Sequence, residues 1–151
     1  MSLSNQKKFL IIKLSALGDI VHALPVARTL RQTYPQAFIA WMIEEHYKEL
    51  LHNNPDIDEI ISIRIKSWKK KWNREALKEI LLLIRKLRQQ NFDVVFDLHG
   101  LIKSGVIAML SGARIKFGFH RKNCKEKISS IFFNKKAPYM AGGIHVIDMY
   151  L

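Results

Sequence analysis

The sequence predicts an α/β fold, a doubly wound and mainly parallel sheet. Short apolar segments rich in β-branched residues alternate with longer segments of helical spacing along the chain. The apolar segments are bounded by charged or small residues, as is typical of strands buried on both faces. Polar residues and glycines follow directly after several of them, where parallel sheets place ligands.

Length and composition narrow the class of protein. The chain has 151 residues, enough for one domain with a substantial core, and 48% of them are apolar, too many for a disordered chain. No apolar run reaches the roughly 18 residues of a membrane span, and residues 1–8 carry no signal-peptide pattern. The single cysteine, Cys124, excludes an internal disulfide. Lysines lie near it but no partner base is evident, so we interpret it as an incidental thiol.

The net charge of +12 is the strongest global signal. A balance this basic indicates an acidic partner, which is either nucleic acid, an anionic membrane surface or a phosphorylated substrate. Residues 145–151 are typical of a helix that has just begun, so we expect the chain to be part of something longer.

The first predicted strand, residues 9–12, leads into the most informative turn. Residues 15–18 form that turn, and Asp19 opens a segment of helical spacing that a Tyr-Pro pair ends. Pro25 either kinks this helix or begins a second one. Asp19 is either the helix N-cap or a carboxylate that faces a substrate. The turn lacks a dinucleotide fingerprint and a P-loop lysine, and Gly18 lets a substrate approach the backbone, so a general base is favoured.

The remaining elements alternate in the same way. We expect four further strands, at residues 37–43, 59–63, 92–98 and 115–118. We expect helices at residues 46–51, 75–90 and 101–110, and a last one from residue 145. Because strands and helices alternate, the carboxyl ends of the strands should meet at one edge of the sheet, and the functional signals should gather there.

Residues 64–74 form a basic segment with no acid and two interleaved tryptophans, Trp68 and Trp72. This segment is either a solvated charged loop, a nucleic-acid patch that stacks bases on tryptophan, or an anion clamp for phosphate or carboxylate groups. Two exposed tryptophans are unusual in a loop that is only solvated, which disfavours the first alternative. A second basic loop spans residues 120–127.

A polar turn, Asp97-Leu98-His99-Gly100, follows the fourth predicted strand. In one interpretation Asp97 caps the next helix and Gly100 only serves the turn. In the other, the turn faces a substrate, His99 donates to a sugar hydroxyl, and Gly100 allows close approach.

The other histidines carry weaker signals. His22 either orients the Asp19 carboxylate or is an ordinary surface histidine. His145 and Asp148 are an isolated pair, and no cluster has metal-ligand spacing, so we expect no metal.

Four separated motifs, in order along the chain, resemble glycosyltransferase family 9, the lipopolysaccharide heptosyltransferases. Residues 11–25 look like the opening of this family, and residues 92–104 resemble its second signature. Residues 64–72 are similar to the heptosyltransferase I branch, and residues 118–146 contain the fourth match. The resemblance therefore covers nearly the whole chain.

The resemblance implies that residues 1–151 form the Rossmann-like, acceptor-binding amino-terminal domain of a two-domain GT-B glycosyltransferase. The implied reaction transfers L-glycero-D-manno-heptose from ADP-heptose to Kdo of lipid A, with inversion, in lipopolysaccharide inner-core synthesis. The donor ADP-heptose would bind mainly to a carboxy-terminal domain absent from this chain, which alone would be inactive. No metal and no further cofactor are implied.

The resemblance also assigns roles to residues of this chain. Asp19 matches the catalytic base, which takes the proton of the acceptor hydroxyl. The positions that match acceptor contacts are Ala16, Gly18, Lys66, Lys69, Lys70, His99, Gly100 and Lys125. The family often has arginines where this chain has these lysines, and lysine keeps the charge but loses bidentate geometry. Many members have Gln at the position of His99.

The implied partners are an acidic lipid-linked sugar, Kdo-lipid A, and the anionic surface of the inner membrane. The protein would be a peripheral monomer at the cytoplasmic face and would not bind nucleic acid. The alternatives are another family 9 transferase such as heptosyltransferase II, a basic nucleic-acid-binding α/β module, and a non-catalytic membrane-surface domain. Asp19 discriminates among these classes, because a transferase needs this carboxylate and a binding module does not.

Overall fold

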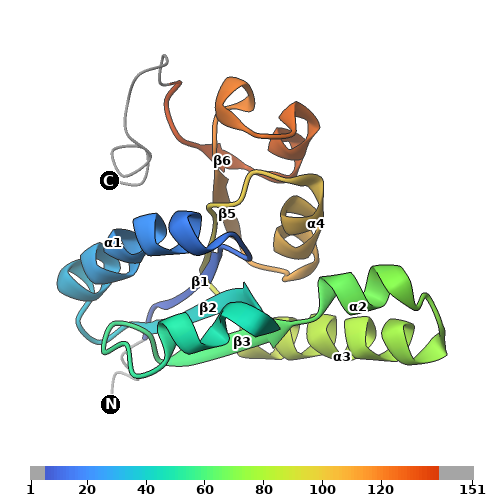
Figure 1. Cartoon of the computed structure of the whole chain (residues 1–151). Coiled ribbons are helices and arrows are strands. Elements are labelled where there is room, and N and C mark those ends of the chain that lie inside the picture. Colours follow the sequence, from blue (N-terminus) through green and yellow to red (C-terminus); the bar gives the residue numbers. More distant parts are fainter. Residues whose placement is uncertain (1–5, 140–151) are drawn as a thin grey trace.

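A six-stranded sheet forms the centre of the computed structural model, which describes residues 6–139. The strand order is β3-β2-β1-β4-β5-β6, and every neighbouring pair is parallel (Figure 1). The strands are β1 (Lys8–Ile12), β2 (Phe38–Glu44), β3 (Glu59–Ile63), β4 (Val94–Asp97), β5 (Ile115–Gly118) and β6 (Lys135–Lys136). The order reverses direction at β1, as in a doubly wound sheet, so the predicted fold class is confirmed.

Helices connect the strands. The α-helices are α1 (Leu17–Thr33), α2 (Ile65–Lys70), α3 (Arg74–Gln90) and α4 (Ile102–Leu110). Three short 3₁₀ segments are η1 (Glu45–Leu51), η2 (Arg121–Asn123) and η3 (Lys127–Phe132). Within residues 6–139, none of these helices has the length and apolar character needed to cross a bilayer.

The core lies on both faces of the sheet, because alternate side chains of a central strand point to opposite sides. In β1, Phe9 and Ile11 pack with apolar residues of α1 on one face. Leu10 and Ile12 pack on the other face with Leu87 of α3 and with residues of α4. The near-continuous burial of β1 and β2 explains why their sequences are apolar runs and not alternating patterns.

Three sequence expectations need correction. Pro25 does not begin a second helix, because α1 runs through it, and buried residues on both sides of Pro25 keep the helix against the sheet. The basic segment 64–74 is not a loop throughout, since Ile65 is buried and anchors the short helix α2. The pair β5–β6 was not expected from the sequence, because β6 has two exposed residues and no apolar pattern. The predicted helix from residue 145 lies outside the described residues.

Candidate active site

The carboxyl ends of the strands lie at one edge of the sheet because the strands are parallel. Asp19 lies in the first turn of α1, just after the connection from β1, His99 lies in the connection after β4, and Lys125 lies in the loop after β5. Since β1 and β4 are neighbours and β4 pairs with β5, these three connections converge at the middle of that edge.

Asp19 is the third residue of α1, and Ala16 occupies the N-cap position without a side-chain capping bond. The interpretation of Asp19 as the N-cap is therefore wrong. A carboxylate in the first turn is still favoured by the helix dipole. About a third of the Asp19 side chain is exposed, so its carboxylate is accessible at the edge of the sheet.

Two lysines converge on one carboxylate oxygen of Asp19. Lys125 Nζ donates to Asp19 Oδ2 at 3.0 Å, and Lys13 Nζ lies 3.7 Å from the same oxygen. Partial burial alone would raise the pKa of Asp19, but the hydrogen bond from Lys125 and the positive charges of both lysines outweigh it. The pKa of Asp19 is therefore lowered from its ordinary value, and the group is a carboxylate at neutral pH.

Lys13 is a site residue that the sequence reasoning missed. It is almost completely buried, and its Nζ donates to the carbonyl oxygen of Leu98 at 3.0 Å. Burial lowers the pKa of Lys13 to about 8, against the opposing charge of Asp19. A lysine that directly follows a strand buried on both faces must find polar partners, and this signal was present in the sequence.

His99 is buried at the same edge. Both of its ring nitrogens are buried without a hydrogen-bond partner among the described residues. Burial, followed by the charges of Lys13, Lys103 and Lys125, lowers the pKa of His99 to about 3, so the ring is neutral. A neutral imidazole has one donor and one acceptor, and both are free here for a ligand or water that reaches them.

Asp97 explains how the β4 turn is held. Its Oδ1 accepts from the backbone N–H of His99 at 2.8 Å and from that of Gly100 at 3.1 Å. Burial raises the pKa of Asp97 to about 6. Asp97 is completely buried and stabilises its own turn, and it is not the N-cap of the next helix, which is Leu101.

Gly18, at the start of α1, and Gly100, two residues before α4, differ in their surroundings. A Cβ added at Gly18 would meet no atom within 4 Å, so the surface there is open. A Cβ added at Gly100 would lie 3.3 Å from Phe119 Cδ2 and 3.4 Å from the backbone nitrogen of Lys125, and Gly100 has a φ of +70°. The chain's own loop therefore takes up the space over Gly100.

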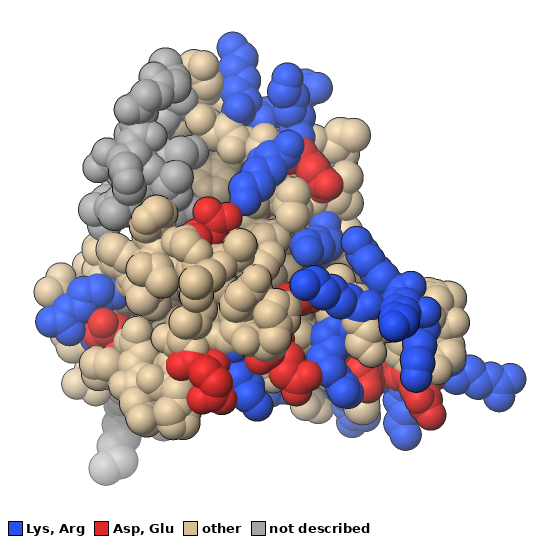
Figure 2. All heavy atoms as spheres, in the orientation of Figure 1, with Lys and Arg blue, Asp and Glu red and all other residues tan. Residues whose placement is uncertain are grey.

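The three predicted lysines of α2, Lys66, Lys69 and Lys70, are exposed at the same edge, because α2 follows the carboxyl end of β3. None of them forms a hydrogen bond or ion pair with another described residue, whereas Lys125 does. Figure 2 shows that lysine and arginine side chains gather over the α2–α3 region and over the segment after β5. No described group of three His, Cys, Asp or Glu side chains is arranged to hold a metal ion.

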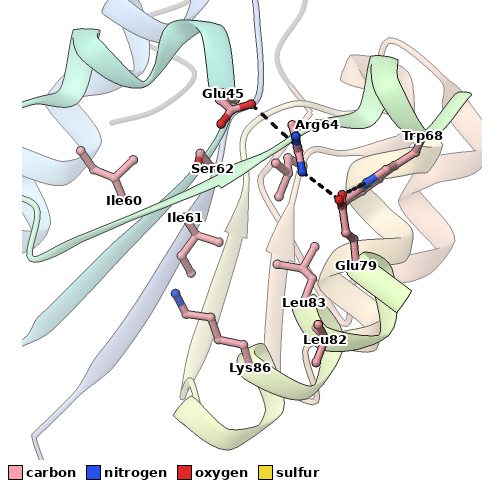
Figure 3. A pocket seen from close by; sticks show the side chains of 11 residues that line it. Glu45, Ile60, Ile61, Ser62, Arg64, Trp68, Glu79, Leu82, Leu83 and Lys86 are labelled. Atoms are coloured by element: carbon pink, nitrogen blue, oxygen red, sulfur yellow. Dashed lines mark hydrogen bonds and ion pairs between the residues drawn. The ribbon is translucent and has the colours of Figure 1, made fainter. Parts of the chain in front are cut away.

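Trp68 and Arg64 have structural partners. Trp68 Nε1 donates to Glu79 at 2.7 Å, and Arg64 donates to the other oxygen of Glu79 at 2.8 Å and lies 3.8 Å from Glu45 (Figure 3). These residues line a pocket of about 550 Å³ between β3 and α3 that does not include Asp19. Trp68 is thus anchored to α3, and its indole nitrogen has a partner.

Comparisons with known proteins identify the family. The sequence model of glycosyltransferase family 9 (heptosyltransferase) matches residues 80–151. Lipopolysaccharide heptosyltransferase 1 of Escherichia coli K12 is 28% identical over 130 residues, which is 85% of this chain and 41% of that protein. Its counterpart in Campylobacter coli is 31% identical over 129 residues, 85% of this chain and 35% of that protein. The chain belongs to glycosyltransferase family 9.

Solved structures support the same assignment for this family 9 chain. Escherichia coli heptosyltransferase WaaC with ADP-2-deoxy-2-fluoro heptose matches with a TM-score of 0.86 and 27% identity, covering 95% of this chain and 45% of that chain. Escherichia coli ADP-heptose heptosyltransferase II matches with a TM-score of 0.71 and 23% identity, over 95% of this chain and 40% of that chain, which shows likeness of fold alone. The family 9 chain spans less than half the length of these relatives.

Proposed function

We propose that this chain is the acceptor-binding, amino-terminal half of a lipopolysaccharide heptosyltransferase of the type 1 branch. Curated heptosyltransferase 1 proteins from several bacteria match over most of the chain, and the likeness to heptosyltransferase II is confined to the fold. The reaction we propose transfers L-glycero-D-manno-heptose from ADP-heptose to Kdo of lipid A. The donor would bind mainly to a carboxy-terminal domain beyond residues 1–151.

The observation that carries this proposal is the accessible Asp19 carboxylate, paired with Lys125 at the carboxyl edge of the sheet. In the proposed reaction the acceptor hydroxyl oxygen attacks the anomeric carbon of the donor from the face opposite ADP. The new C–O bond forms as the bond to the ADP oxygen breaks, Asp19 takes the hydroxyl proton, and ADP leaves. One carboxylate is sufficient for this inversion.

Lys125 links acceptor binding to the strength of this base. While Lys125 donates to Asp19, the carboxylate is stabilised and is a weak base. Lys125 is more than half exposed, so an acidic acceptor can attract its ammonium group away from Asp19. Losing that partner raises the pKa of Asp19 and makes it a better base when the acceptor is in place. Lys13 is buried and stays, which holds the carboxylate in position.

The other acceptor contacts in this proposal follow the same edge. Ala16 and Gly18 offer an open backbone surface beside Asp19, and His99 offers a neutral ring without a protein partner. The exposed α2 lysines supply charge for the phosphate and carboxylate groups of the acceptor. Gly100 contributes indirectly, because its positive φ allows the turn after β4 that positions His99. The protein would act as a peripheral monomer at the cytoplasmic face of the inner membrane.

Acceptor binding by this chain alone tests the proposal. We would titrate a soluble Kdo-containing glycan and measure its dissociation constant by NMR. Replacing Lys66, Lys69 and Lys70 together by Gln should raise the dissociation constant at least tenfold, or about 1.4 kcal/mol. The effect should shrink at high salt, because exposed charges are screened over about 10 Å at 0.1 M ionic strength.

The matched control removes three positive charges elsewhere, by replacing the exposed Lys7, Arg85 and Arg114 with Gln. Its dissociation constant should stay near the wild-type value. If both triple variants lose affinity equally, the basic residues act only through net charge, and the α2 acceptor site is contradicted.

A further inference from the structure

The hairpin formed by α2 and α3, residues 65–90, carries exposed apolar side chains that the proposed acceptor site does not use. In Figure 1 it projects from the side of the sheet, and the turn between the two helices lies far from the core. Trp72 lies in that turn and is 74% exposed. Its neighbour Trp68 is anchored by Glu79, so Trp72 has no comparable structural reason to be a tryptophan.

The solvent face of α3 continues this surface. Leu77, Leu81 and Leu82 are each about half exposed. Leu77 and Leu81 are four residues apart and therefore lie one above the other on the helix. By contrast, another face of α3 carries the buried residues Ala76 and Leu87, and Leu87 packs in the core on one side of the sheet. The exposed leucines are thus additional to the apolar stripe that folding requires.

Cations surround these apolar side chains. Arg74, Lys78 and Arg85 are exposed at helical spacings that place them on the same side of α3 as Leu77 and Leu81. Two lysines of the proposed acceptor site, Lys69 and Lys70, and their neighbour Lys71 continue the positive charge into α2 and the turn, and Figure 2 shows this concentration of lysine and arginine. Glu75 is the exposed acid on this face of α3.

From this combination we infer that the α2–α3 hairpin docks on a membrane surface rich in anionic lipid. Tryptophan and leucine enter the boundary between headgroups and acyl chains, while lysine and arginine stay with the anionic headgroups. Nucleic acid would satisfy the charge but leave the three leucines exposed. The occupant is therefore a bilayer with negative headgroups.

Docking through this hairpin also explains how the edge of the sheet that carries Asp19 comes close to a lipid-linked acceptor. Because α2 begins directly after β3, the hairpin starts at the edge of the sheet that carries Asp19. A sugar attached to a lipid in the same bilayer would be presented to that edge. The inference rests on the proposed function only for the identity of the acceptor, and the docking itself follows from the hairpin.

Vesicle binding tests this inference. The chain is mixed with vesicles of phosphatidylcholine alone or of phosphatidylcholine with phosphatidylglycerol, neither of which contains acceptor, and sedimentation gives the partition coefficient. We expect binding to the anionic vesicles that weakens with salt. Replacing Trp72, Leu77 and Leu81 together by Ser should lower the partition coefficient at least tenfold, with all lysines and arginines retained.

The matched control replaces three exposed apolar residues elsewhere, Met109, Ile128 and Ile131, by Ser. This variant should bind vesicles as the wild type does. Thermal unfolding of both variants by circular dichroism checks that each is folded. Tryptophan emission should also move to shorter wavelength on vesicle binding, and this shift should be absent in Trp72→Phe.

Three results would overturn the inference: equal partition of the Ser variant and the wild type, equal binding to neutral and anionic vesicles, or tighter binding to single-stranded RNA than to vesicles. These outcomes are independent of the soluble-glycan titration. A negative result in the vesicle experiment therefore does not contradict the proposed acceptor site. A negative result in the glycan titration does not contradict the docking surface.

Discussion

The connection from β1 to α1 and the connection from β4 to α4 look alike in sequence but differ in structure. Each has an aspartate and a glycine within a few residues of the point where a buried strand gives way to a helix. Asp19 is partly exposed, has two lysine partners and has a lowered pKa, whereas Asp97 is buried, accepts backbone N–H groups and has a pKa raised to about 6. Gly18 borders open space, and Gly100 is covered by the chain.

The loop after β5 determines which of the two connections is accessible. Residues 119–126 pack over Gly100, and the backbone N–H of Glu126 donates to the carbonyl of Gly100. The Glu126 carboxylate also accepts from the N–H of Ile102 in the first turn of α4. The preceding residue, Lys125, donates a hydrogen bond from its side chain to Asp19. One loop thus closes the β4 connection and supplies a charge to the β1 connection.

The largest expected effect is on the turnover number, which should fall when Asp19 is replaced by Asn but not when Asp97 is. In an active transferase that contains this chain, Asp19→Asn should lower the turnover number by about 10²–10⁴, or roughly 3–5 kcal/mol in the barrier, because an amide cannot accept the proton. The fold should also lose some stability, because the amide no longer neutralises the buried Lys13 ammonium group, so circular dichroism is used to check that the variant is folded. Asp97→Asn should keep most of the turnover, because the Asn oxygen can still accept the two backbone hydrogen bonds.

Steady-state transfer from ADP-heptose measures both variants under the same conditions. If Asp19→Asn retains more than about a tenth of the wild-type rate, less than general-base catalysis normally contributes, Asp19 is structural and His99 is the next candidate.

Replacement by alanine should affect the stability of the fold differently at the two glycines. Gly100→Ala should destabilise the fold by about 1–3 kcal/mol, because alanine disfavours a φ of +70° and its Cβ would crowd Phe119. Gly18→Ala should leave stability unchanged or raise it by up to about 1 kcal/mol, because alanine favours the helix and its Cβ meets open space. Urea unfolding at neutral pH measures both variants.

The same pair distinguishes binding from stability. Gly18→Ala should weaken binding of the soluble glycan even though it does not weaken the fold. An unchanged glycan affinity would show that the acceptor does not approach the backbone at Gly18.

The neutral state of His99 should make stability depend on pH. Its pKa of about 3 in the folded state lies below the ordinary value of about 6.5, so the unfolded chain binds the proton first as pH falls. This group's contribution is complete above pH 6.5 and decreases at lower pH, by about 2 kcal/mol between pH 7 and pH 5. His99→Gln should remove that decrease, whereas replacement of the exposed His52 by Gln should have a smaller effect.

The contribution of Asp97 to the free energy of unfolding changes with pH in the opposite direction, over an overlapping pH range. Because its folded pKa of about 6 is above the ordinary value, its contribution to stability increases as pH falls from 6 toward 4. The difference in free energy of unfolding between wild type and His99→Gln, measured at pH 7 and at pH 5, cancels the Asp97 contribution. A difference that does not change with pH would contradict a buried, neutral His99.

The fold class and most of the strands and helices could be predicted from the sequence. Apolar runs predicted β3 and β5 with their observed bounds, and β1, β2 and α3 to within one residue at each end. These signals are local, because burial on both faces requires a continuous apolar run and an amphipathic helix requires its periodicity. The placement of Asp19 at the carboxyl edge followed from the same alternation of strands and helices.

The contacts between polar residues of the site could not be predicted from the sequence, because they depend on how distant segments pack. The contact between Asp19 and Lys125 joins positions 106 residues apart, and no periodicity encodes it. The same holds for the burial of Lys13 against the carbonyl of Leu98, and for the anchoring of Trp68 by Glu79. The lowered pKa values of Asp19 and Lys13 depend on burial and on the distance between charges in three dimensions, and the chain has neither until it folds.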